Sequence, residues 1–482
     1  MCVGALETPE SCRAWKDEFG LTCPVVPDAE GALFRQVTNG WVPCNILVGL
    51  DGKVLFAENE FDEAGYSAAI AAMYETPPVS RPVPSGVGEP RPLPASARRG
   101  TSTIVILGGG VGGLVAAHRL RRRLSRNHRI VVIDRWSHHL FSSSLLWLMV
   151  GHRRSDQIRR PLQSLAGKGI EFHQGEIEEL SLDRRFVRTD SQRFEFDYLI
   201  VSLGAQLAPE SVAGFGEMAH NLYDLEGSRS IHEALKTFEG GTIGVLIAAM
   251  PFKCPAAPYE AAFLVEAWCR RHGIRDKTEI HLLTPEHQPM PVAGAMLGER
   301  IVDLLRAHGI HYHPLYTFKA LRPDRREVVS ADGRAERIDL LLGVPPHRAP
   351  DVIRSSGLVG VSGWIHVDAH TLRTEHEGVF AIGDITSIRL ADGKALPKAG
   401  VFAHAEAEVV AERIAAEIQG RQSHAAFDGR GSCWVELGDG RAGFARGRFY
   451  AEPSPEVRMF RPGRVWHWGK VAFETWWLHH WF

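Results

Sequence analysis

Three closely spaced glycines constrain the fold of this chain more than any other feature. Gly108, Gly110 and Gly113 form a G-x-G-x-x-G pattern directly after Thr103–Leu107, an apolar run that predicts a buried strand. The first glycine permits a tight turn, the second lets the backbone approach a pyrophosphate, and the third allows a helix to pack closely on the strand. The free N–H groups at the N-terminus of that helix attract phosphate. The pattern therefore predicts a dinucleotide-binding α/β domain.

An acidic residue at the expected distance supports this interpretation. Asp134 follows the next predicted strand, residues 130–133. In dinucleotide-binding domains the acidic residue at this place accepts hydrogen bonds from the adenosine ribose hydroxyls. The alternative, a glycine-rich turn that holds no ligand, does not account for Asp134.

Strands and helices alternate after the glycine turn, which predicts parallel sheets covered by helices. We expect two Rossmann-like dinucleotide-binding domains, the second of which begins near Thr242. The predicted strands are 103–107, 130–133, 198–203, 242–248 and 279–283, and the predicted helices are 114–124, 257–272 and 298–307.

A proline-rich segment divides the chain into a small N-terminal module and a large C-terminal body. Residues 77–100 contain seven prolines, and such a segment cannot sustain helix or sheet hydrogen bonding, so we expect an extended linker. The expected limits are 1–76 for the small module, 77–100 for the linker, 101–241 and 366–425 for the two parts of the first domain, 242–365 for the second domain and 426–482 for a C-terminal region.

The small module combines predicted helices at 9–19 and 61–73 with strands at 42–48 and 54–58, joined by a hairpin turn at Asp51-Gly52. Preceded by Val42-Pro43, this order resembles the second half of a thioredoxin-like redoxin domain. The family's first strand and catalytic cysteine helix have no counterpart here. We therefore expect a truncated module without redox activity. Cys44, next to Pro43, is the one residue of this module that we single out as a candidate redox residue.

Composition excludes several classes of function. The formal net charge is −2, which does not suggest a nucleic-acid partner. The sequence has no apolar run of about 18 residues and no secretory signal, so we expect neither a transmembrane helix nor export. The seven cysteines include no CxxC pair, which argues against a zinc ribbon and against a dithiol motif. The histidines show no convincing metal-ligand spacing.

Two further segments resemble disulfide-reductase-type flavoproteins. LIVSLG (199–204) is an apolar strand that ends in a small-residue turn at Gly204, and GVFAIGD (378–384) resembles the late flavin motif. The resemblance implies that the dinucleotide is FAD. It also implies that Gly204 and Gly383 lie near the FAD, that Asp384 contacts the ribityl chain, and that the helix after Asp384 points at the pyrophosphate.

The second domain lacks the glycine fingerprint that a nicotinamide nucleotide requires. The predicted strand 242–248 runs into AMPFKCP (249–255), where Pro251 and Pro255 remove backbone N–H donors. We therefore expect that neither NADH nor NADPH is the electron donor. The loop instead presents Cys254 at the place that would face the flavin.

Four motifs resemble the family of sulfide:quinone oxidoreductases and flavocytochrome c sulfide dehydrogenases. They are FKCPAAPYE (252–260), ALPKAG (395–400), SCWVELGD (432–439) and WHWGKVAFE (466–474), and the resemblance extends over residues 100–482. It implies that Cys254 and Cys433 hold sulfide-derived sulfur and pass two electrons through FAD to a quinone. It also implies that Lys398 stabilises the reduced flavin. Lys253 is a candidate for the positive charge that would lower the pKa of Cys254.

One departure concerns a third cysteine that many family members carry. NLYD (221–224) contains none, which puts a three-cysteine cycle in doubt. A two-cysteine cycle and a related thiol or persulfide donor both stay open. The alternatives are a flavoprotein subunit that delivers electrons to a cytochrome, an NADH:quinone reductase, and a flavin-binding redox sensor without catalytic activity.

The C-terminal tail is rich in aromatic residues. Phe473, Trp476, Trp477 and Trp481 recur at helical spacing, and basic groups lie beside them. Tryptophan suits a membrane interface, so we expect a peripheral membrane protein, on the cytoplasmic side, that draws quinone from the bilayer. The alternative is a tail that packs on the body or on a partner subunit, and a homo-oligomer is left open.

Overall fold

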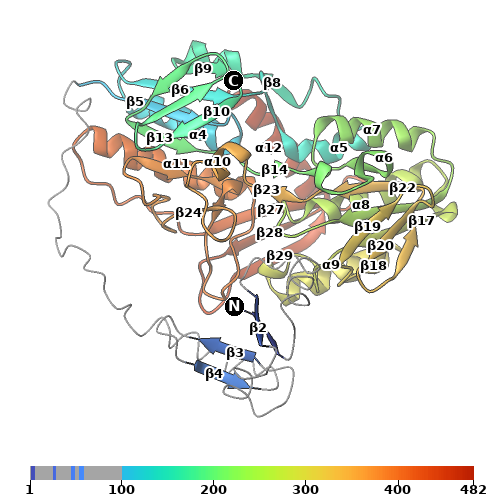
Figure 1. Cartoon of the computed structure of the whole chain (residues 1–482). Helices are drawn as coiled ribbons and strands as arrows, with labels where there is room; N and C mark the ends of the chain where they lie inside the picture. Colours follow the sequence, from blue (N-terminus) through green and yellow to red (C-terminus); the bar gives the residue numbers. More distant parts are fainter. Residues whose placement is uncertain (1, 6–24, 29–44, 49–53, 59–99) are drawn as a thin grey trace. The chain divides into compact units, whose positions relative to one another are not determined.

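The computed structural model describes residues 2–5, 25–28, 45–48, 54–58 and 100–482 (Figure 1). The chain divides into two compact units, residues 1–92 and 93–482. In the first unit β1 (Cys2–Ala5) pairs in parallel with β2 (Val25–Asp28), and β3 (Asn45–Val48) pairs antiparallel with β4 (Val54–Glu58). The predicted strand pair is thus present. The predicted helices, the Asp51-Gly52 turn, Val42-Pro43, Cys44 and the linker lie outside the described residues.

The first dinucleotide fold of the larger unit is a five-stranded parallel sheet in the order β25-β13-β5-β6-β9. Its apolar side chains alternate between two covered faces: Ile104 and Ile106 pack under the helices, whereas Val105 and Leu107 pack on the opposite side. The elements are β5 (Thr103–Leu107), β6 (Arg129–Asp134), β9 (Glu171–Gln174), β13 (Tyr198–Val201), β25 (Val379–Ala381), α4 (Val111–Arg123) and α11 (Gly400–Ile418).

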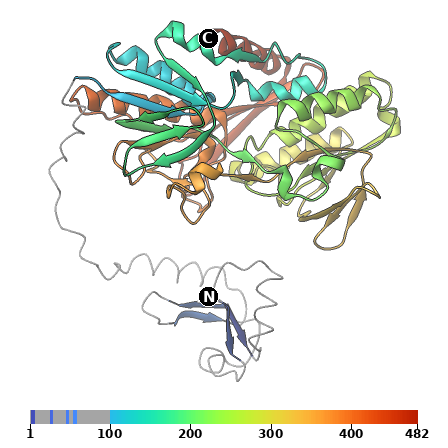
Figure 2. The same cartoon turned by 45° about the horizontal axis from the view of Figure 1, so that its top comes forward.

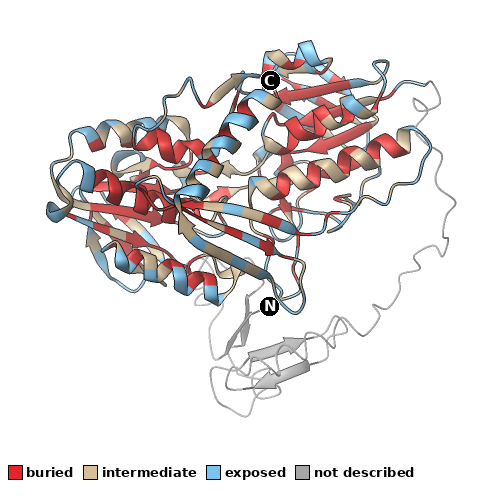
Figure 3. Cartoon of the chain, turned by 180° about the vertical axis from the view of Figure 1, so that it is seen from behind, coloured by how far each residue is buried: buried red, intermediate tan, exposed pale blue. Residues whose placement is uncertain are grey.

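The second dinucleotide fold repeats this plan with the order β15-β22-β16-β17-β18, again all parallel. Its elements are β15 (Ala219–Asn221), α7 (Leu225–Lys236), β16 (Gly241–Ile247), α8 (Ala257–Arg271), β17 (Thr278–Leu283), α9 (Ala295–Ala307), β18 (His311–His313) and β22 (Leu340–Val344). The two folds lie side by side (Figure 2), and the strands and the inward helix faces are buried (Figure 3). The predicted α/β fold with two Rossmann-like domains is confirmed.

Each parallel sheet is accompanied by a three-stranded antiparallel sheet. The first consists of β10 (Ile177–Ser181), β11 (Phe186–Thr189) and β12 (Arg193–Glu195), and the second of β19 (Phe318–Arg322), β20 (Glu327–Ser330) and β21 (Ala335–Arg337). Shorter elements complete the body: β7 (His138–Leu140), α5 (Leu145–Met149), β8 (Arg159–Pro161), β14 (Gln206–Leu207), α6 (Phe215–Met218), β23 (His347–Arg348), α10 (Asp351–Arg354), β24 (Ile365–His366) and β26 (Thr386–Ser387).

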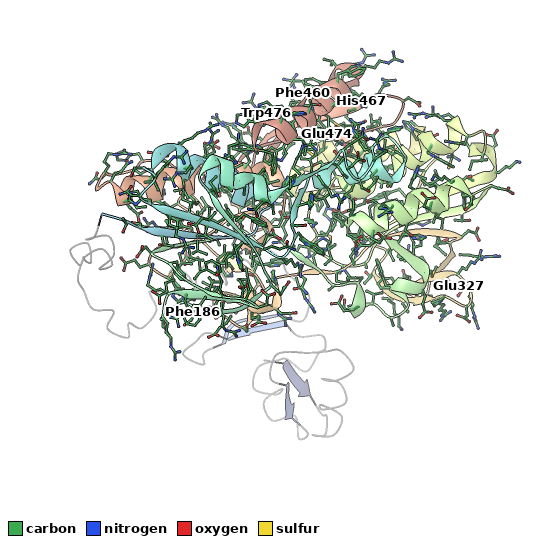
Figure 4. All side chains as sticks on the ribbon, turned by 90° about the horizontal axis from the view of Figure 1, so that it is seen from above. Phe186, Glu327, Phe460, His467, Glu474 and Trp476 are labelled. Atoms are coloured by element: carbon green, nitrogen blue, oxygen red, sulfur yellow. The ribbon has the colours of Figure 1, made fainter. Side chains whose placement is uncertain are left out.

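The C-terminal region is an antiparallel sheet followed by a helix. β27 (Arg430–Glu436), β28 (Ala442–Arg448) and β29 (Glu456–Gly463) lead into α12 (Arg464–His480). An ion pair ties α12 to the body, because Glu474 accepts hydrogen bonds from Ser144 and from Arg153, the latter with Nη2 and Oε2 2.7 Å apart. Figure 4 labels His467, Glu474 and Trp476 on this helix and Phe460 on β29 before it.

The aromatic tail forms the predicted helix, but only one of its faces meets solvent. Trp477 and Trp481 are buried in the core of the first domain, with 1% and 0% exposure. Trp477 also donates a hydrogen bond to His139 across a distance of 3.1 Å. The alternative of a tail that packs on the body therefore holds for Trp477 and Trp481, because this face of the helix completes the core. Trp468 and Trp476 stay exposed.

This arrangement predicts opposite effects for two neighbouring tryptophans. Trp477→Ala should lower the free energy of unfolding by about 3–5 kcal/mol, because it leaves a cavity and removes the hydrogen bond to His139. Trp476→Ala is the matched control and should change it by less than about 1 kcal/mol. Thermal and urea unfolding of both variants measures the difference. Equal destabilisation by the two substitutions would contradict the burial of Trp477.

Candidate active site

One cavity of about 1090 Å³ runs through the larger unit. Its wall contains nearly every residue that the sequence motifs single out, although these residues come from segments far apart in the chain. The predicted residues on the wall are Gly108, Gly110, Asp134, Gly204, Cys254, Gly383, Asp384, Lys398 and Cys433. Gly113 lies behind the wall, in the packing between helix and strand.

The glycine turn fits its predicted roles. Gly108 has a φ of +102°, and a Cβ there would lie 2.4 Å from the Ser202 carbonyl oxygen. At Gly113 a Cβ would lie 1.8 Å from the Gly108 oxygen, so any side chain would push the helix off the strand. A Cβ at Gly110 would meet no described atom within 4 Å. The protein's own packing thus requires the first and third glycines, whereas the second leaves open the cavity beside the N-terminus of α4.

Asp134 stabilises this turn as well as lining the cavity. Its carboxylate accepts hydrogen bonds from the backbone N–H groups of Gly109 (2.6 Å) and Trp136 (2.8 Å). Burial raises the pKa of Asp134, and the two N–H groups oppose that rise. The carboxylate therefore holds the glycine turn in place and can still accept hydroxyl donors at the cavity surface.

Asp384 supplies an independent test of whether the cavity suits FAD. Its Oδ1 atom is buried and has no hydrogen-bond partner among the described residues. Burial raises the pKa of Asp384, opposed by the positive charges of Lys253 and Lys398. A buried carboxylate oxygen without a partner is costly unless a ligand donates to it. The hydroxyl groups of a ribityl chain are such donors, so the residues present fit FAD.

A short segment separates Asp384 from the helix that follows it. Gly383–Ile385 forms a single 3₁₀ turn, and the next helix, α11, begins only at Gly400. The N-terminus of α11 nevertheless reaches the site, because Gly400 and Val401 line the cavity. The helix that follows Asp384 in the sequence therefore begins at the cavity wall.

Cys254 lies on the loop between β16 and α8 in a left-handed conformation, with a φ of +48°. Such a conformation is uncommon for a residue other than glycine and marks local strain, which concentrates at functional sites. The backbone N–H of Cys254 donates to the carbonyl oxygen of Lys398 at 2.7 Å. This hydrogen bond holds the strained cysteine at the cavity wall.

Cys433 reaches the same cavity from β27. Its side chain is exposed to the cavity, and its thiol donates to the Trp434 carbonyl oxygen at 3.2 Å. Both Cys254 and Cys433 are free thiols. Burial raises the pKa of Cys433, and the charge of Cys254 raises it further, so the two sulfur groups influence each other electrostatically.

Burial outweighs the lowering of the Cys254 pKa that was expected from a neighbouring positive charge, although Cys254 and Lys253 do interact. Burial raises the pKa of Cys254 to about 12, the charge of Glu260 adds to the rise, and the opposing positive charge comes from Lys470. Lys470 belongs to α12, far away in sequence, so sequence adjacency alone did not reveal this charge. Burial also lowers the pKa of Lys253 itself, and the charge of Cys254 opposes this fall.

Glu260 and Lys470 form a buried ion pair that sequence reasoning missed. The Lys470 Nζ and Glu260 Oε2 atoms are 2.5 Å apart, and Glu260 also accepts the backbone N–H of Glu436 at 3.1 Å. Both side chains line the cavity beside the cysteines. Glu260 and Lys470 lie within the motifs at 252–260 and 466–474. The presence of one acidic and one basic residue in these two motifs is the sequence feature that could have predicted the ion pair.

Lys398 lines the cavity with its ammonium held against the wall. Its Nζ donates to the carbonyl oxygens of Asp384 (2.7 Å) and Thr386 (3.1 Å) and lies 3.4 Å from the centre of the Trp364 ring. Burial lowers the pKa of Lys398 to about 8. The side chain thus fixes the late flavin motif and keeps a positive charge next to it.

Comparison with known proteins identifies the family. Residues 102–407 match the family model for pyridine nucleotide-disulphide oxidoreductases. The chain belongs to this family. It is therefore an oxidoreductase, and membership implies a flavin cofactor.

Individual relatives agree with the motifs. The mitochondrial sulfide:quinone oxidoreductase of Mus musculus is 26% identical over 371 residues, which cover 73% of this chain and 79% of that protein. The X-ray structure of the sulfide:quinone oxidoreductase from Aquifex aeolicus matches with a TM-score of 0.71 at 24% identity and covers 78% of this chain and 90% of that one. An alternative NAD(P)H-ubiquinone oxidoreductase from Arabidopsis thaliana is 26% identical over 357 residues (66% and 68%). The resemblance to sulfide:quinone oxidoreductases is confirmed.

The different surroundings of two glycines predict separable defects. Gly110→Ala should leave the fold intact and weaken FAD binding by at least about tenfold, because the new methyl group enters the open cavity. Gly113→Ala should destabilise the apoprotein itself, by about 1–3 kcal/mol or more, because the methyl group overlaps backbone. Flavin fluorescence titration and thermal unfolding of apoprotein measure the two effects. Unchanged FAD affinity in Gly110→Ala would refute the assignment of the turn.

Proposed function

We propose that this protein is an FAD-dependent enzyme that oxidises sulfide, or a related persulfide or thiol, and passes two electrons through FAD to a quinone. The observation that carries the proposal is that two free cysteines, Cys254 and Cys433, line the same cavity as the residues suited to FAD. The similarity to sulfide:quinone oxidoreductases supports the same activity.

The cysteines can perform this chemistry as a pair. In the oxidised enzyme, hydrosulfide attacks the disulfide between Cys254 and Cys433, which breaks the S–S bond and leaves one persulfide and one thiolate. The thiolate then bonds to the outer sulfur of the persulfide. The S–H proton of the persulfide leaves to solvent, and the two electrons would pass to bound FAD, so that a trisulfide remains. A nucleophilic acceptor takes the central sulfur of the trisulfide, and the disulfide between Cys254 and Cys433 forms again. No third cysteine is needed.

Charged residues assist these steps. The thiolate that leaves in the first step is stabilised by Lys470, whose charge lowers the pKa of both cysteines. FAD, when bound, accepts the two electrons and delivers them to the second substrate. Lys398 holds positive charge beside Asp384 and would stabilise negative charge on a reduced flavin bound in the cavity.

The nicotinamide alternative is disfavoured by the loop after β16. There the residues that would cradle a second pyrophosphate are replaced by Pro251, Lys253, Cys254 and Pro255, and two of these positions lack an N–H donor. A cytochrome-linked dehydrogenase shares the sulfur chemistry and differs in its electron acceptor. A redox sensor would bind FAD without turnover.

Direct reduction of the flavin by sulfide tests the proposal. The FAD-loaded protein mixed anaerobically with sulfide in a stopped-flow instrument should lose its flavin absorbance band, and a quinone analogue should restore it. Cys254→Ser should lose at least about 100-fold in the rate of bleaching, because no disulfide can form. Cys269→Ser, which alters a buried cysteine on α8, is the matched control and should retain the rate.

Each of the other outcomes would favour one of the alternative functions. Bleaching by NADH and not by sulfide would refute the sulfur chemistry and favour the nicotinamide reductase. Restoration by a cytochrome and not by quinone would favour the dehydrogenase subunit. If neither sulfide nor NADH bleaches the flavin, the protein is either a redox sensor or an enzyme that uses another donor.

We also propose that the quinone reaches the site from a membrane on which the C-terminal region lies. No helix among the described residues is long and apolar enough to cross a bilayer. Trp468 and Trp476 are 65% and 44% exposed, and Trp466 stacks on Phe444 with ring centres 4.7 Å apart. Exposed arginines lie on the same sheet and helix, where they would meet anionic headgroups: Arg446, Arg458, Arg461 and Arg464.

Vesicle binding tests the membrane surface. The double variant Trp468→Ala/Trp476→Ala should bind vesicles of phosphatidylcholine with one third phosphatidylglycerol about tenfold more weakly, because two interfacial rings are lost. Flotation of the protein with the vesicles measures binding. Met296→Ala, which removes an 80% exposed side chain on α9, is the control and should bind as the wild type does. Equal binding by all three proteins would contradict the proposal.

A further inference from the structure

Glu406 is a buried carboxyl group that neither the sequence motifs nor the proposed sulfur chemistry use. It lies on α11 and is 1% exposed. Its Oε2 atom accepts a hydrogen bond from the backbone N–H of Gly383 at 2.6 Å. Gly383 immediately precedes Asp384, so Glu406 touches the back of the turn whose front faces the cavity.

Three other ionisable groups surround Glu406. Asp384 lies on the turn that Glu406 contacts, and Lys398, just before α11, donates to the Asp384 carbonyl oxygen at 2.7 Å. The third group is the Tyr450 phenol, which follows β28; burial raises the pKa of Tyr450, and the negative charge of Glu406 raises it further. The cluster thus contains two carboxyl groups, one ammonium group and one phenol.

Glu406 is the group of this cluster that gains or loses a proton near neutral pH. Burial raises the pKa of Glu406 to about 7, the charge of Asp384 adds to the rise, and the Gly383 N–H and Lys398 oppose it. Below pH 7 Glu406 is therefore mostly protonated, and above pH 7 it is mostly ionised. Additional negative charge in the cavity raises this pKa further, because it destabilises the carboxylate.

We propose that Glu406 is the proton-holding group of the flavin site, which takes up a proton when two electrons enter the cavity and releases it when they leave. This inference rests on the proposed function, because it requires FAD to be bound in the cavity. The electrons come from the sulfur donor and leave to the quinone. The proton comes from solvent, forms the O–H bond of Glu406 and returns to solvent when that bond breaks. Glu406 is a positioning residue, because it acts through the turn of Gly383 and Asp384 and not on the substrate.

The pH dependence of the flavin midpoint potential tests this inference. Spectroelectrochemical titration of the FAD-loaded protein should show, above about pH 7, a slope steeper by about one proton per two electrons, or about 30 mV per pH unit, than in Glu406→Gln. Below about pH 6 the two slopes should agree, because Glu406 is then protonated in both redox states. Glu412→Gln, on the same helix and paired with Arg123 at 2.6 Å near the surface, is the control and should behave as wild type.

A second measurement does not depend on the variant. Infrared difference spectra of wild-type protein at pH 8 should show a protonated-carboxyl band that appears on reduction. Identical slopes in wild type and Glu406→Gln, or the absence of this band, would overturn the inference. Because an electrode supplies the electrons, the result does not depend on whether sulfide is the donor. A failure of the sulfide experiment would therefore contradict the proposed function and not the role of Glu406.

Discussion

The hydrogen bond from the Cys254 N–H to the Lys398 carbonyl oxygen joins the two halves of the site. Cys254 belongs to the second dinucleotide fold, and Lys398 to the segment that leads into α11. The Lys398 side chain then turns back onto the late flavin motif and donates to the carbonyl oxygens of Asp384 and Thr386. One residue therefore fixes the sulfur-bearing loop and the Asp384 turn relative to each other. The strained backbone of Cys254 persists because the surrounding structure determines its position.

The C-terminal helix extends this connection to the molecular surface. α12 contributes Trp477 to the core of the first domain and Lys470 to the ion pair with Glu260, whereas Trp476 is exposed. Removal of one partner of a buried ion pair costs about 3–5 kcal/mol, because the other charge is left uncompensated. The helix is thus held by packing and by charge, and the surface proposed to meet the membrane is rigidly linked to the cysteines.

Local patterns predicted the parts of this site that depend on backbone shape. The glycine turn follows from steric limits on a few neighbouring residues, and Asp384 follows from its place after an apolar strand. The ion pair of Glu260 and Lys470 joins residues 210 positions apart, and neither motif alone shows that the two side chains meet. At Cys254 burial outweighs the nearby charge of Lys253, because sequence adjacency does not measure burial. The aromatic spacing of the tail predicted a helix correctly, although periodicity cannot distinguish a lipid-facing from a core-facing stripe.

The raised thiol pKa values determine which sulfur species can react. At neutral pH a cysteine with a pKa of about 12 is almost entirely thiol, and a thiol is a poor nucleophile. In the proposed cycle the group that attacks first is therefore hydrosulfide from solution, and the cysteines enter the cycle as the oxidised pair. The cysteine that leaves must still carry negative charge in a buried place. Lys470 is the cation that stabilises it there, and Glu260 holds Lys470 in position, so the ion pair adjusts the reactivity of the disulfide without touching the substrate.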